Sequence, residues 1–168
     1  MTTRTLADHI RPLKLARAER RRTRRGADLT GRALAAIQHR ENVEQLLQPY
    51  LDTLRDAIPE LWPRRRLFDG CWVLGLEADL PCGSFKGRPY RAYSRLEYAI
   101  RIDLANDEFS VKCSTTVFDQ DAESDLFEGT LSNLDEDALS IFVEHHCLLF
   151  ATRFFKQAPR RREAADAA

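Results

Sequence analysis

The sequence predicts an α+β fold, in which a kinked N-terminal helix and a long C-terminal helix pack on the apolar face of an antiparallel meander of three to four strands. Hydrophobic residues recur with helical spacing in the flanking parts of the chain and alternate with a period of two in its middle. That alternation leaves one apolar sheet face for the helices to cover. A chain of 168 residues is long enough for one such domain.

The first 57 residues predict an arm followed by a helix. Residues 1–27 are rich in arginine and weakly periodic, which is typical of a basic flexible arm. Asp28 is a suitable N-cap, and apolar residues follow it with helical spacing. Pro49 lacks an amide donor and its ring crowds the preceding turn, so we expect the helix to kink or restart there.

An extended connector and the first strand come next. Pro59 and Pro63 bracket the connector, which leads through Trp62 to the arginine triplet 64–66. Over residues 71–80 every second side chain is apolar, which predicts a strand with one apolar face.

The central hairpin has the clearest alternation in the chain. Residues 90–104 and 109–117 predict two strands, joined by a two-residue turn at Asn106 and Asp107. The register expected from that turn pairs Leu104 with Phe109, Ile102 with Val111, Ile100 with Cys113, Leu96 with Val117 and Arg101 with Lys112.

The last part of the chain predicts a loop and a helix. Residues 119–125 are strongly acidic and indicate a solvated loop, with a short edge strand over 127–131. Three acids at 135–137 suit a helix N-terminus, and the helix reaches about Lys156. The predicted organisation is thus one domain over residues 28–157 and a disordered tail over 158–168.

The net charge of zero conceals a segregation of charge. Residues 1–32 carry a net charge of +7, residues 33–151 a net charge of −10, and the remainder +3. Arginine makes bidentate phosphate contacts, so we expect any nucleic-acid binding to be confined to the basic ends; the alternative is a merely solubilising arm. The candidate phosphate-binding residues of the arm are Arg20, Arg21, Arg22, Arg24 and Arg25.

Four dispersed cysteines in a chain of this size favour a reduced, cytoplasmic protein. No apolar run approaches the roughly 20 residues that span a bilayer, so we expect no membrane partner. The sequence also indicates no cofactor.

The sequence contains no convincing catalytic or metal-binding set. His145 and His146 are adjacent, and neighbouring helix residues point about 100° apart, which disfavours a shared metal ion. Cys113 beside His146 would form a nucleophilic pair, but the expected burial of the thiol favours inert packing. If a pocket exists between sheet and helices, its candidate lining is Trp72, Tyr98, Cys113 and His146.

Basic and aromatic residues interleave on the predicted polar sheet face. Arg91, Tyr93 and Arg95 share this face, and Glu77 and Asp79 of the preceding strand lie within pairing reach. This pattern favours a ladder of cross-strand pairs, with a phosphate- or base-binding surface as the alternative.

These observations favour a non-catalytic intracellular adaptor that binds a protein, with a second copy of the chain as one candidate partner. Its basic arm would contact nucleic acid or another acidic surface. The alternative is a small enzyme or ligand carrier with a pocket between the sheet and the helices.

Overall fold

The computed structural model describes the backbone of residues 6–166 and the side chains of residues 30–82, 86–88, 90–120 and 124–157. The chain divides into two compact units, Met1–Gln38 and His39–Ala168. The elements are α1 (Leu6–Ala57), β1 (Trp62–Phe68), β2 (Cys71–Phe85), β3 (Arg88–Asp103), β4 (Glu108–Val117), β5 (Gln120–Thr130) and α2 (Glu136–Asp166). The α+β class is therefore confirmed.

Helix α1 begins and continues differently from the prediction. It starts at Leu6, well before Asp28, so residues 6–27 of the predicted arm are helical, whereas the side chains of residues 1–29 lie outside the described part. The predicted restart at Pro49 is wrong, because the helix runs through it, and a kink there stays a prediction. Proline removes one backbone hydrogen bond, but buried Leu47 and Leu51 anchor the helix to the core on either side.

The sheet has five antiparallel strands in the order β1-β2-β3-β4-β5, so the prediction of three to four strands is wrong. The second part of the expected connector, residues 62–66, forms the edge strand β1 together with Leu67 and Phe68. Pro63 is compatible with this position because an edge strand does not need every amide. The opposite edge strand, β5, takes in most of the predicted acidic loop 119–125.

The register of the central hairpin is shifted by two residues from the prediction. Observed partners are Ile102 with Phe109, Ile100 with Val111, Tyr98 with Cys113, Leu96 with Thr115 and Arg101 with Ser110. The strands end at Asp103 and Glu108, which leaves four residues in the loop. The Asp103 carboxylate stabilises this longer loop, since it accepts hydrogen bonds from the amides of Ala105 (2.9 Å) and Asn106 (3.3 Å). A shift of two keeps every side chain on its predicted face.

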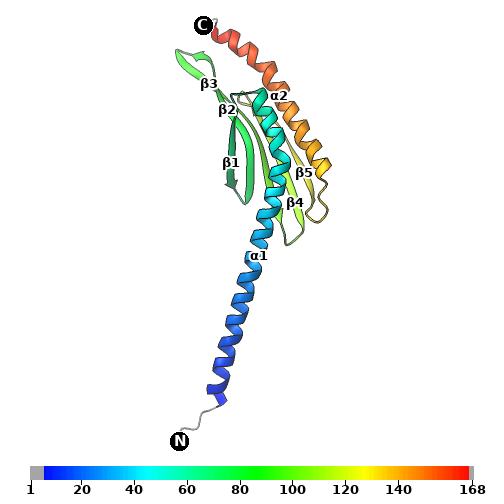
Figure 1. Cartoon of the computed structure of the whole chain (residues 1–168). Coiled ribbons are helices and arrows are strands. Elements are labelled where there is room, and N and C mark those ends of the chain that lie inside the picture. The colour runs from blue at the N-terminus through cyan, green and yellow to red at the C-terminus, as the bar shows by residue number, and fades with distance from the viewer. Residues whose placement is uncertain (1–5, 167–168) are drawn as a thin grey trace. The chain divides into compact units, whose positions relative to one another are not determined.

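The core of the second unit lies between the helices and one face of the sheet (Figure 1). Its helical members are Val43, Leu47, Leu51 and Leu54 of α1 and Leu139, Val143, Cys147, Phe150 and Phe154 of α2, and Ile58 joins them just after the end of α1. The hydroxyl of Tyr98 on β3 donates to the carbonyl of Val143 at 3.1 Å, which ties the sheet to α2. We call the opposite side of the sheet the open face.

Helix α2 starts where the three acids predict. The Asp135 carboxylate caps it by accepting a hydrogen bond from the amide of Ala138 at 2.9 Å. The helix continues to Asp166, beyond the end expected near Lys156, so its backbone also covers most of the predicted tail.

Candidate binding surfaces

The four residues predicted to line a pocket are packing residues. Tyr98 and Cys113 are fully buried, His146 is nearly so, and Trp72 is half-buried beneath the guanidinium of Arg40, 4.6 Å from its ring centre. The Tyr98 hydroxyl also lies 3.5 Å from the Cys147 sulfur. Tyr98 and Cys113 belong to the hydrophobic core between the sheet and the helices, and Trp72 packs against it.

The buried thiols are in their unreactive form. Burial, with a smaller effect of Cys147, raises the pKa of Cys113 to about 12. Burial also raises the pKa of Cys147 to about 11. A nucleophilic cysteine needs a depressed pKa, so these two thiols are suited to packing.

His146 joins α2 to the edge strand β5. Its Nε2 atom lies 3.4 Å from Oδ2 of Asp125, and its ring meets Phe142 edge-on at 4.6 Å between centroids. Among the residues that the structure describes, no group of three or more histidines, cysteines or acids is placed to hold a metal ion.

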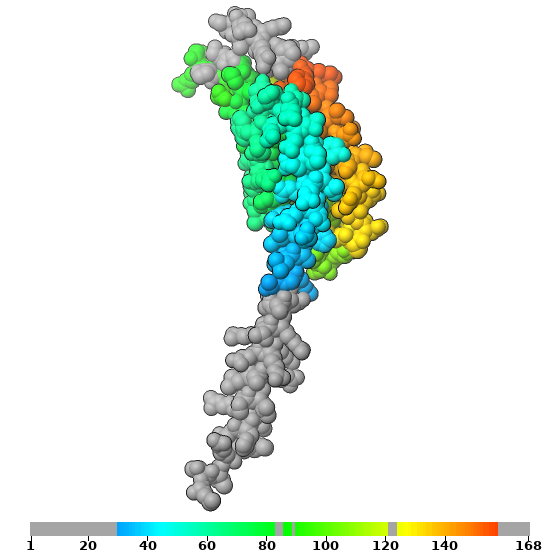
Figure 2. Space-filling model, viewed as in Figure 1, coloured from blue at the N-terminus to red at the C-terminus, as the bar shows by residue number. Residues whose placement is uncertain are grey.

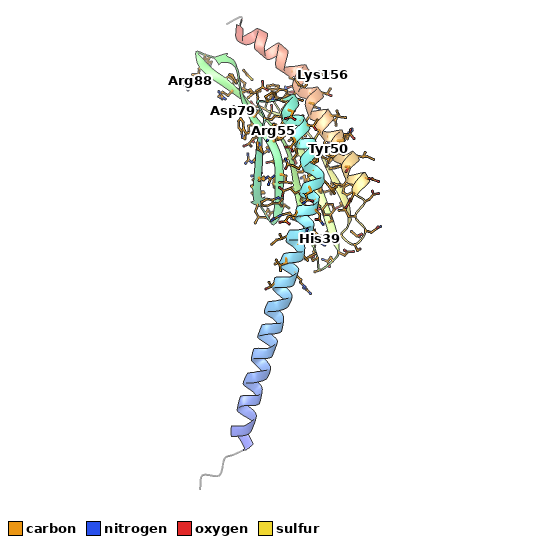
Figure 3. All side chains as sticks on the ribbon, viewed as in Figure 1. His39, Tyr50, Arg55, Asp79, Arg88 and Lys156 are labelled. Atoms are coloured by element: carbon orange, nitrogen blue, oxygen red, sulfur yellow. The ribbon has the colours of Figure 1, made fainter. Side chains whose placement is uncertain are left out.

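The interleaved residues Arg91, Tyr93 and Arg95 lie together on the open face, as the alternation predicts. Nε of Arg91 lies 3.0 Å from Oδ2 of Asp79, the pairing expected (Figure 3 labels Asp79). Tyr93 donates to Glu77, but the arginine paired with Glu77 is Arg64 of β1 and not Arg95. Because residues 62–68 were not predicted to be a strand, Arg64 was not expected as the partner of Glu77.

A second carboxylate, Glu97, forms ion pairs with three guanidinium groups. Its oxygens lie 3.7 Å from Arg64 Nε, 3.2 Å from Arg66 Nη2 and 3.4 Å from Arg95 Nη1. Gly75 leaves room for it, since a Cβ there would lie 2.2 Å from the Leu96 oxygen and 3.0 Å from Glu97 Cα. Glycine at this position therefore permits the close approach of β2 and β3 beneath the carboxylate.

Hydrogen bonding fixes the charge states in this network. Burial opposes ionisation of Glu77, but hydrogen bonds from Tyr93, Arg64 and Trp62 outweigh it and lower its pKa. Burial and the bond to Glu77 raise the pKa of Tyr93. At neutral pH Glu77 is therefore a carboxylate and Tyr93 a neutral phenol.

Strand β1 sends alternate side chains to opposite sides of the sheet. Trp62, Arg64, Arg66 and Phe68 share the open face, as their pairing with β2 shows. Arg65 points to the helical side, where it reaches Glu44 at 2.5 Å and Gln48 at 3.0 Å. The connector expected from Pro59 and Pro63 did not allow for this alternation.

The outer face of α2 carries a row of apolar side chains, also missed from the sequence. Ile141, Leu148 and Phe155 are 67%, 61% and 52% exposed, respectively. They are seven residues apart, which keeps them on nearly one line along the helix. We call these three residues the α2 stripe. Figure 2 shows α2, in yellow to orange, at the surface of the second unit. The seven-residue spacing of the α2 stripe is the signal in the sequence that identifies it.

The arm residues Arg20, Arg21, Arg22, Arg24 and Arg25 lie in α1, and their side chains are outside the described residues. In the described part of the chain, neither helix combines the length and apolarity needed to cross a bilayer. Comparison with protein-family models, with curated proteins and with solved structures finds no match.

Proposed function

We propose that this protein is a non-catalytic protein-binding module that associates with a second copy of itself through the α2 stripe. The exposure of these three large apolar side chains in a row carries the proposal. Isolated exposed apolar residues are ordinary, but an aligned set on one helix is typical of helix-to-helix docking.

The spacing of the stripe suits a two-fold antiparallel pair. Leu148 lies midway between Ile141 and Phe155, seven residues from each. In an antiparallel pair centred on Leu148, that residue meets its own copy and Ile141 meets Phe155 of the second copy. An interface of this kind uses the same patch on both subunits.

The charges on α2 also favour an antiparallel arrangement of the two helices. Glu136, Asp137 and Glu144 lie in its first half, whereas Arg153 and Lys156 lie in its second half (Figure 3 labels Lys156). An antiparallel partner brings acidic halves beside basic halves and opposes the helix dipoles. A parallel partner would instead place acids beside acids.

The size of the surface indicates a weak, reversible dimer. The 22 residues from Glu136 to Gln157 form a face about 33 Å long and about 10 Å wide. This is well below the roughly 800 Å² per partner of a standard stable interface. We therefore expect a dissociation constant in the micromolar range or weaker.

Sedimentation equilibrium over a range of concentrations tests the proposal. Wild type should show a monomer–dimer equilibrium that Leu148→Glu abolishes, because two carboxylates would be placed together at the symmetry axis. Leu126→Glu is the matched control, since Leu126 is half-exposed on β5, and should dimerise like wild type. A wild type that stays monomeric at several hundred micromolar, or equal effects of the two substitutions, would contradict the proposal.

Binding of nucleic acid by the arm is a second proposed function, supported by the segregation of charge. The first unit has ten arginine and lysine residues and three acids, a net charge of +7, and the second unit balances it at −7. Attraction to phosphates is accordingly concentrated in the first unit.

A further inference from the structure

A row of aromatic and cationic side chains lies on the open face of β1. The order along the strand is Trp62, Arg64, Arg66 and Phe68. Alternate residues of a strand are about 6.6 Å apart, so the two aromatic rings are about 20 Å apart with two guanidinium groups between them. Trp62 is 44% exposed and Phe68 60% exposed. The guanidinium of Arg66 lies over one face of the Phe68 ring, 5.0 Å from its centre, so a base would stack on the face that Arg66 does not cover.

The guanidinium groups of Arg64 and Arg66 are held in place by carboxylates that are more deeply buried. The side chains of Arg64 and Arg66 are 30% and 34% exposed, whereas those of Glu77 and Glu97 are 16% and 9% exposed. The carboxylates are thus the deeper partners and the guanidinium groups are nearer to solvent. With Arg95 the cluster has three positive and two negative charges, which leaves a net charge of +1.

The described contacts use only part of the donor capacity of these arginines. A guanidinium has five N–H donors in a planar fork. Arg64 uses Nη1 for Glu77 and Tyr93 and places Nε near Glu97, and Arg66 uses Nη2 for Glu97. Nε of Arg66 is itself buried, so the donors left for a phosphate are at the Nη ends of the two arginines. Arginines that are already fixed bind phosphate without first losing side-chain freedom.

We infer that single-stranded nucleic acid binds along β1 on the open face, with bases stacked on Trp62 and Phe68 and phosphates at Arg64 and Arg66. The spacing along the strand is comparable to the phosphate spacing of an extended single strand. Flat aromatic surfaces alternating with cations are the usual platform for unpaired bases. An acidic peptide would engage the arginines but would leave both rings uncovered, so the observations favour nucleic acid.

Fluorescence anisotropy of the full-length protein with labelled oligo-dT and oligo-U tests this inference. Loss of one stacking ring in Phe68→Ala should weaken binding roughly 5- to 150-fold. The control is Leu67→Ala, because Leu67 is the adjacent, more exposed residue and pairs with Trp72 on the helical side of the sheet. It should bind like wild type. Far-UV circular dichroism and urea unfolding establish that both variants fold.

A charge-matched pair provides the second arm of the experiment. Arg66→Gln removes a cation from the open face, and Arg65→Gln removes one from the helical side of the same strand. Arg66→Gln should reduce the salt slope, −d log K/d log[salt], by roughly 0.7, the value for one phosphate contact on a single strand. Arg65→Gln should leave the slope unchanged.

Three results would overturn the inference. One is equal binding by Phe68→Ala and Leu67→Ala. Another is equal salt slopes for Arg66→Gln and Arg65→Gln, because binding would then depend on net charge or on the arm alone. The third is displacement of oligo-dT by polyglutamate of equal charge at the same concentration, which would identify an acidic polypeptide as the ligand.

Discussion

The close contact at Gly75 makes Gly75→Ala a sharp test of the sheet geometry. The added Cβ would lie 2.2 Å from the Leu96 carbonyl oxygen and 3.0 Å from Glu97 Cα. Both atoms belong to the backbone of β3, so relief requires β2 and β3 to move apart. Overpacking of a close-packed site commonly costs about 1–3 kcal/mol, and a rigid backbone neighbour places this variant at or above about 3 kcal/mol. That is a large part of a total stability of roughly 5–15 kcal/mol.

Gly129→Ala is the matched control for this experiment. Gly129 lies in β5, and a Cβ there has no atom within 4 Å in the described structure. Alanine restricts the unfolded chain more than glycine does, so this variant should be unchanged or more stable by up to about 1 kcal/mol. Urea unfolding followed by circular dichroism gives both free energies of unfolding. Equal stability of the two variants would refute the close approach of β2 and β3 at Gly75.

Three further predictions concern the core, the open face and the arm. Phe150→Ala should cost roughly 3–5 kcal/mol in urea unfolding because Phe150 lies on the buried face of α2, whereas Phe155→Ala, at an exposed position of the same helix, should cost far less; similar losses would remove α2 from the core. The lowered pKa of Glu77 stabilises the fold above the unfolded pKa of about 4.3 and this contribution is lost as pH falls through the lower folded value. Glu77→Gln should therefore flatten the acid limb of a stability–pH profile, and an unchanged limb would contradict the network. Replacing Arg20, Arg21, Arg22, Arg24 and Arg25 by alanine should lower the salt slope of binding to generic nucleic acid by roughly 3.5–4.5 if all five reach phosphate, and coincident slopes would remove the arm from nucleic-acid binding.

The faces of the central strands could be predicted from the sequence, but their register could not. Alternation over β3 and β4 reports which side chains are buried, because one face meets the helices. The register depends on the length of the loop, and that length depends on hydrogen bonds of the Asp103 side chain to Ala105 and Asn106. Such bonds leave no trace in hydrophobic periodicity. The predicted faces are still correct because the register differs from the prediction by an even number of residues.

The open-face network could be predicted only in part, for a related reason. The pair Arg91 and Asp79 joins neighbouring strands and follows from alternation alone. Glu97 and its partners on β1 depend on recognising residues 62–68 as a strand. Consecutive arginines hide that strand, since Arg65 on the helical side is stabilised by Glu44 of α1, a contact distant in sequence. The α2 stripe was visible in principle, because heptad spacing needs no knowledge of the fold.

Cysteine cross-linking across α2 tests the proposed self-association most directly. The antiparallel arrangement predicts that Leu148→Cys forms a disulfide-linked dimer under mild oxidation, because position 148 meets its own copy at the distance a disulfide needs. Ile141→Cys alone should remain monomeric, since its copy would be 14 residues or about 21 Å away along the helix. A mixture of Ile141→Cys and Phe155→Cys should give the mixed dimer, and wild type, with its own four cysteines, sets the background. Efficient homodimers of Ile141→Cys would show a parallel pair, and no dimer of Leu148→Cys above the wild-type background would contradict self-association through α2.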